Sequence, residues 1–108
     1  MKKIIQYYGL KNQKKKFAEE NLELQEAITE YTKILSNFEG APEEVIAQNL
    51  EPYKQHIIEE LADNFVLLGQ FMEYFGIKKY EVEGAALFKI GRTHALMEGE
   101  NYSNDLLG

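Results

Sequence analysis

Residues 57–75 read IIEELADNFVLLGQFMEYF, and this stretch decides the predicted fold. At about 100° per residue, its apolar side chains cover most of the circumference of a helix, which is typical of a buried helix. Glu60 and Asp63 lie three residues apart on one face, and Leu67 continues that face as apolar surface. Because burying an ionised carboxylate is costly without compensation, the pair predicts a positive partner, either a metal ion or a basic side chain.

The remainder of the chain predicts further helices and no strand. Apolar residues recur at spacings of three, four and seven before the central stretch, and a mixed apolar and basic face follows it. Prolines and glycines separate these segments. The other predicted helices span residues 12–38, 43–50 and 79–99, with Gly40, Pro52, Gly76 and Gly99 at their ends. We therefore expect an all-α bundle.

Composition limits the class of protein. The 108 residues predict a single domain, residues 1–108, with a loosely ordered tail from about Gly99. The net charge is −6 and the largest basic cluster is Lys14-Lys15-Lys16, so we expect no nucleic-acid partner. There is no cysteine, and no apolar run reaches the length of a membrane span or signal peptide. These features predict a soluble cytoplasmic protein with no membrane partner.

Polar side chains also fall inside the apolar faces of two other predicted helices. On the first long helix, Glu20 and Gln13 lie within the apolar stripe and Glu23 lies on its flank. On the fourth helix, Lys89 and Arg92 lie among apolar residues in the same way. Three helices thus direct four carboxylates, an amide and two cations toward one interior, which ordinary core packing does not explain.

This set of side chains predicts a hard oxygen site. Carboxylates without a thiolate or a well-placed imidazole suit Mg²⁺, or Mn²⁺, held partly through water and substrate phosphate. Neither His56 nor His94 follows a glutamate by three residues, so the Glu-x-x-His pair of di-iron bundles is absent, and we expect both histidines at the surface. Because Lys89 and Arg92 would take up phosphate charge beside a metal ion, phosphoanhydride hydrolysis is the leading expected reaction.

Each feature also has a structural interpretation. The acids fit a solvated rim that pairs with Lys89 and Arg92 at the edge of a bundle. The long aliphatic stems of these two cations can cover core surface while their charged heads reach water. Gln13 by itself suits a capping or surface position. The paired acids inside apolar faces favour the metal site over the solvated rim.

Four segments of the chain resemble a known family. They read NQKKKFAEENLELQEAITEYTK, HIIEELAD, FGI and EVEGAALFKIGRTHALM, and they resemble the MazG-like all-α nucleoside triphosphate pyrophosphohydrolases, in particular their short single-domain members. The family pattern, Glu-x-x-Glu followed by Glu-x-x-Asp with basic residues downstream, matches Glu20, Glu23, Glu60, Asp63, Lys89 and Arg92. The sequence differs from the clear family pattern in two ways. Glu23 with Glu26 also satisfies the first motif, and Asn64 occupies a position where an apolar residue is more usual.

The resemblance implies Mg²⁺-dependent hydrolysis of a nucleoside triphosphate to the monophosphate and pyrophosphate, as in cleaning of the nucleotide pool. It implies a four-helix-bundle-like fold of three long helices and one short helix, completed in a homodimer or homotetramer. The four acids would hold the metal and act in catalysis, and Lys89, Arg92 and Gln13 would contact the substrate. The alternative function is a non-catalytic helical oligomerisation protein whose charges form interhelical salt bridges.

Overall fold

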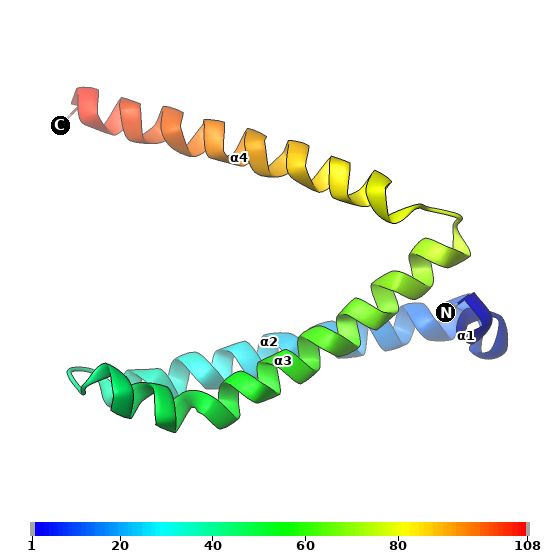
Figure 1. Ribbon diagram of the computed structural model, residues 1–108, viewed down its shortest axis with the longest axis horizontal. Helices are drawn as coiled ribbons and strands as arrows, with labels where there is room; N and C mark the ends of the chain where they lie inside the picture. The colour runs from blue at the N-terminus through cyan, green and yellow to red at the C-terminus, as the bar shows by residue number, and fades with distance from the viewer. Residues whose placement is uncertain (1, 108) are drawn as a thin grey trace. The chain divides into compact units, whose positions relative to one another are not determined.

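The computed structural model describes the backbone of residues 2–107 and the side chains of residues 3–100. Over this range the chain is helical and contains no strand, so the all-α prediction with three long helices is confirmed (Figure 1). The elements are α1 (Lys2–Tyr8), α2 (Leu10–Leu35), the short 3-10 helix η1 (Ser36–Phe38), α3 (Glu43–Tyr74) and α4 (Lys79–Leu107). The chain divides into two compact units, Met1–Tyr74 and Phe75–Gly108.

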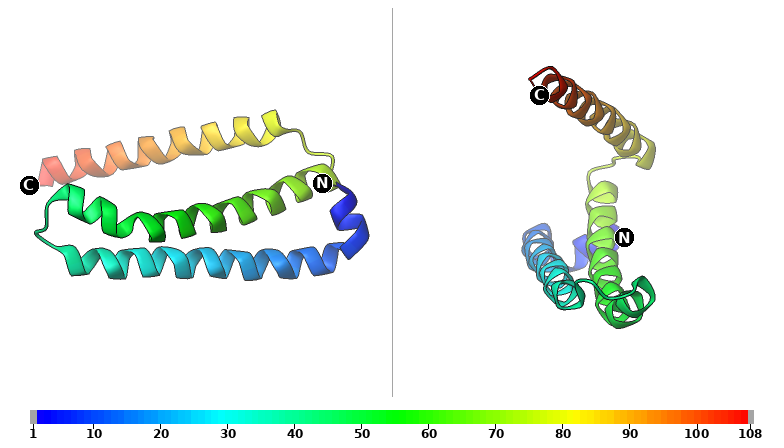
Figure 2. Two further views of the ribbon diagram at one scale, coloured as in Figure 1. Left: turned by 60° about the horizontal axis from the view of Figure 1, so that its bottom comes forward. Right: turned by 90° about the vertical axis from the view of Figure 1, so that its left-hand side faces the viewer.

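In the first unit, α2 and α3 run antiparallel and side by side (Figures 1 and 2). Their contact follows a narrow stripe on each helix, because the buried positions recur at twice the seven-residue repeat or at a spacing of three. The buried residues of this seam are Gln13 and Ala27 on α2 with Leu50, Asn64, Leu67 and Gln70 on α3. The rings of Phe17 and Phe71 meet edge to face across it, with their centroids 5.6 Å apart.

The helix α1 closes one end of this pair. Gly9 has a φ of 87°, a left-handed conformation that glycine adopts without a steric penalty, and it lets the chain turn sharply between α1 and α2. Ile5 is 1% exposed, and α1 contacts both α2 and α3. The apolar side of α1 is therefore used inside the unit, which holds this short helix in place.

The predicted break at Pro52 is wrong. Pro52 lies inside α3, so the short helix expected over residues 43–50 is the first part of a single 32-residue helix. Proline removes the hydrogen bond to the carbonyl of Gln48 and crowds that group, which costs about 3 kcal/mol inside a helix. Figure 2 shows α3 bending in its first third, and Leu50, two residues before the proline, is 3% exposed, so its burial stabilises the continued helix.

Within the first unit, the helix predicted over residues 57–75 is buried on part of its circumference only. Leu67 is 2% exposed, but Leu61 is 50% exposed and Phe65 is 74% exposed. The reason is that α2 covers only one stripe of α3 within the first unit. The large hydrophobic residues left exposed on this stretch are Ile58, Leu61, Phe65, Val66, Leu68, Tyr74 and Phe75.

The helix α4 forms the second unit. Its start is capped, because Glu81 accepts a hydrogen bond of 2.7 Å from the backbone N–H of Lys78. It passes through Gly99, where the sequence predicted its end, and continues to Leu107. The side chains of the predicted loosely ordered tail after residue 100 lie outside the described residues. No described helix of the protein has a stretch long and apolar enough to cross a bilayer.

Candidate metal centre

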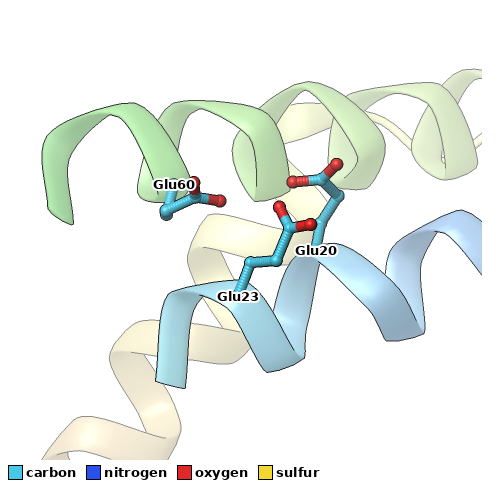
Figure 3. A group of neighbouring side chains, drawn as sticks. All are labelled: Glu20, Glu23 and Glu60. Atoms are coloured by element: carbon cyan, nitrogen blue, oxygen red, sulfur yellow. The ribbon is translucent and has the colours of Figure 1, made fainter. Parts of the chain in front are cut away.

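Three carboxylates from two helices converge at the seam between α2 and α3. Glu20 and Glu23 leave neighbouring turns of α2, Glu60 leaves α3, and all three reach into the space between the helices (Figure 3). One oxygen of each lies within 4.8 Å of one oxygen of the other two. Of the two registers compatible with the sequence, it is Glu20 with Glu23 that comes together with Glu60. We call these three residues the acid cluster.

Burial differs within the acid cluster. The side chains of Glu20 and Glu60 are 13% and 12% exposed, whereas Glu23 is exposed to solvent. The Oε2 atoms of Glu20 and Glu60 are both buried and have no hydrogen-bond partner in the structure. Because a buried carboxylate oxygen without a partner is costly, the two orphaned oxygens mark a place where a cation would stabilise the fold.

Two basic side chains approach the acid cluster from its edges. Lys16 Nζ lies 3.5 Å from Oε1 of Glu20, one turn away on α2. His56 Nε2 lies 3.4 Å from Oε1 of Glu60, one turn away on α3, and His56 Nδ1 lies 3.9 Å from Glu30 on α2. The contacts of Lys16 with Glu20 and of His56 with Glu60 are both made to Oε1, so the buried Oε2 atoms of the two glutamates have no partner. Lys16 is 56% exposed and His56 is 46% exposed, so solvent weakens both contacts.

The pKa of Glu20 is raised above its ordinary value of 4.5. Burial is the largest cause, followed by the negative charges of Glu23 and Asp63 and by a hydrogen bond with Glu23, and Lys16 opposes the shift. A raised carboxyl pKa means that negative charge at this position is unfavourable in the metal-free protein. A divalent cation would remove that penalty.

The other predicted site residues lie outside the acid cluster. Asp63 is exposed and acts on the pKa of Glu20, but it is not one of the three residues whose oxygens converge. Gln13 is 5% exposed and donates a hydrogen bond of 2.7 Å from Nε2 to Oε1 of Gln70, so its amide links the two helices. Lys89 and Arg92 are exposed on α4, in the second unit. Substrate contacts by these three polar residues, and metal binding by Asp63, stay predictions.

Sequence reasoning missed two residues at this place. His56 was expected at the surface, and although half exposed it contacts Glu60 on one side and Glu30 on the other. Its spacing of four from Glu60 could have indicated the contact, because residues four apart on a helix are neighbours. Asn64 lies in the buried seam, where a polar residue in an apolar stripe could have indicated an interhelical hydrogen bond.

An apolar groove of about 590 Å³ lies between α2 and α3 beside Asn64. Phe17 and Leu24 of α2 form one wall, and Leu61 and Phe65 belong to the opposite wall on α3. The groove and the acid cluster therefore involve the same two helices. Together they offer an apolar surface and a concentration of negative charge on one unit of the chain.

The donor atoms of the acid cluster fit a hard divalent cation. All are carboxylate oxygens, which are the ligands that Mg²⁺ and Mn²⁺ prefer. No family model, curated protein or solved structure matches this chain. The resemblance to the MazG-like enzymes therefore rests on its motifs and their spacing.

Proposed function

We propose that the protein is a Mg²⁺-dependent nucleoside triphosphate pyrophosphohydrolase. The observation that supports this most is the convergence of Glu20, Glu23 and Glu60 within 4.8 Å, with two buried oxygens that lack partners. Surface acids that only solvate a helix do not leave buried, unpartnered oxygens. The order of the Glu-x-x-Glu and Glu-x-x-Asp motifs supports the same function.

In this function Glu20, Glu23 and Glu60 would hold the ion at the seam, and Asp63 adds charge at its edge. When bound, the ion would polarise the phosphoryl group and favour ionisation of a water molecule. Glu23 is the exposed member of the acid cluster, so it is the carboxylate that can orient the attacking water and accept its proton. Attack at the α-phosphorus breaks the α–β anhydride bond and releases pyrophosphate.

Lys89 and Arg92 bind the phosphates of the substrate, and this part of the proposal rests on the sequence. A guanidinium and an ammonium form charge-assisted hydrogen bonds with phosphate oxygens. The protein acts as a homodimer or homotetramer, because the exposed apolar residues of α3 need a partner surface.

A panel of canonical and modified nucleoside triphosphates tests the proposal. Each nucleotide is incubated with the protein and Mg²⁺, and pyrophosphate and the monophosphate are measured. The proposal expects equal amounts of both products from at least one nucleotide, with loss of turnover in Glu60→Gln and in EDTA. Release of orthophosphate instead, or turnover that Glu60→Gln leaves intact, contradicts it.

A helical oligomerisation protein without catalytic activity is the second candidate. The exposed apolar residues Leu61 and Phe65 favour it, since such side chains often mark contact surfaces. It expects interhelical salt bridges around the acids. The contact between His56 and Glu30 is of this kind, but it is long at 3.9 Å. A protein that assembles but releases no pyrophosphate with any nucleotide would favour this candidate.

A further inference from the structure

Asn64 joins the two helices at the acid cluster. Its side chain is 7% exposed, and its Nδ2 atom donates two hydrogen bonds. One, of 2.8 Å, goes to the backbone carbonyl of Glu60 one turn earlier on α3, and the other, of 3.1 Å, goes to the backbone carbonyl of Glu20 on α2. These are the two half-buried members of the acid cluster, so one amide group contacts the backbone of both.

The hydrogen bonds fix the orientation of this amide. Turning it over would place Oδ1 against two carbonyl oxygens, which are acceptors like itself. In the observed orientation Oδ1 is buried and has no hydrogen-bond partner. An apolar residue of similar size would avoid that unfavourable burial. Burying the Oδ1 atom of Asn64 is thus unfavourable compared with an apolar side chain, and the two directed hydrogen bonds from Nδ2 are the favourable interactions that an apolar residue would lack.

Directed hydrogen bonds matter here because apolar contacts do not define where a helix lies along its axis. Leu50, Ala27 and Leu67 pack in the same seam, and packing of this kind is non-directional and tolerates small sliding movements. Three carboxylate oxygens on two helices lie within 4.8 Å of one another only while the axial register of α2 against α3 is kept. The hydrogen bond from Asn64 to the backbone carbonyl of Glu20 sets that register at a member of the acid cluster.

We propose that Asn64 is a positioning residue that fixes the register of α2 against α3, so that Glu20, Glu23 and Glu60 present their oxygens to one divalent cation. This inference rests on the proposed function, because it supposes that the acid cluster binds a metal ion. Asn64 itself contacts neither the metal nor the substrate. Its effect on the ion passes through the backbones of the two acids, as partners outside the ligand set commonly do.

Binding of Mn²⁺ to the full chain, measured by electron paramagnetic resonance in titrations, tests the inference without relying on activity. Asn64→Leu removes both hydrogen bonds and the orphaned acceptor, and the two carbonyl groups keep their helical hydrogen bonds. We expect Mn²⁺ affinity to fall by about tenfold or more, with the melting temperature of the metal-free protein nearly unchanged. Asn64→Ser, which is small and lacks the amide, is measured in the same way and decides the matter if Asn64→Leu does not fold.

Gln70→Leu is the matched control. It removes the other buried interhelical amide, the acceptor of the bond from Gln13, at a position away from the acid cluster. It should lower the melting temperature and leave Mn²⁺ affinity unchanged. Wild-type affinity in the Asn64 variants overturns the inference and leaves the metal site standing. An equal loss in Gln70→Leu also overturns it, because general loosening of the seam would then be the cause. A wild-type chain that binds no Mn²⁺ overturns both the inference and the proposed metal site.

Discussion

Replacing Glu20 by glutamine distinguishes a metal site from a structural salt bridge, because the two predict changes of opposite sign in the stability of the metal-free protein. Glu20→Gln removes one negative charge from the acid cluster and keeps the shape of the side chain. In the metal-free protein the acids repel each other, and Lys16 at 3.5 Å offsets only part of that repulsion. We expect Glu20→Gln to be more stable than the wild type without metal and less stable than the wild type at saturating Mg²⁺.

The magnitude follows from the distances. Two carboxylates 4.8 Å apart repel by about 1 kcal/mol in water and by about 3.5 kcal/mol at an effective dielectric constant of about 20. Glu23 is exposed, so the lower figure applies to its pair with Glu20, and losing the contact with Lys16 costs about 0.5 kcal/mol. The net gain without metal is about 0.5 kcal/mol, which raises the melting temperature by about 2–4 °C for a domain of this size. At a Mg²⁺ concentration about 100 times its dissociation constant, the wild type gains about 2.7 kcal/mol that the variant lacks.

Thermal unfolding followed by circular dichroism measures this difference, with EDTA in one series and increasing Mg²⁺ in the other. Glu26→Gln is the control, because it removes one charge from an exposed position of α2 outside the acid cluster. It should leave the response to Mg²⁺ unchanged. If Glu20→Gln is the less stable protein in EDTA, and Mg²⁺ does not alter the order of the two proteins, the acid cluster is a structural ion-pair site and the metal interpretation is refuted.

Three further predictions concern pH, phosphate binding and assembly. Because the pKa of Glu20 is raised above 4.5, the folded protein binds more protons than the unfolded chain just above that pH, so the wild type gains stability as the pH falls from neutral toward 4.5. In urea unfolding, the free energy of unfolding of Glu20→Gln should exceed that of the wild type by less and less over this range. A difference in unfolding free energy that does not depend on pH would contradict the shift. Arg92→Met should keep its melting temperature and lose about 2–4 kcal/mol of transition-state stabilisation, read from kcat/KM, whereas a large fall in melting temperature with unchanged turnover would make Arg92 a structural cation. Phe65→Lys places a charge on a side chain that is 74% exposed and should convert the predicted homodimer or homotetramer to a smaller species in light scattering, and a wild-type chain that is already monomeric at micromolar concentration would rule out the predicted assembly.

The sequence predicted the helices well where periodicity was long. The central part of α2 and the end of α3 near Gly76 follow from apolar spacing and a glycine with positive φ, whereas the predicted helix over 12–38 is α2 from Leu10 to Leu35 followed by the 3-10 helix η1. Pro52 was misjudged because the local penalty of a proline is visible in the sequence, whereas the tertiary burial of Leu50, which stabilises the continued helix, is not.

The acid cluster was predicted in part. The helical wheel identified Glu20, Glu23 and Glu60, since their positions relative to the apolar stripe depend only on spacing along each helix. The exposure of Asp63 could not be predicted, because the width of the seam depends on how closely α2 and α3 approach. The hydrogen bond of Asn64 to the backbone of Glu20 was equally hidden, since it depends on the register between residues 44 positions apart.

Calorimetric titration of the metal-free protein with Mg²⁺ tests most directly whether the acid cluster is a metal centre. The wild type should bind Mg²⁺ at a fixed ratio of ions per chain, and the Glu20→Gln/Glu60→Gln double variant should remain helical and show no binding in the same range. Absence of binding to the wild type at millimolar Mg²⁺, with or without a nucleotide, or equal binding to the double variant, would contradict the account.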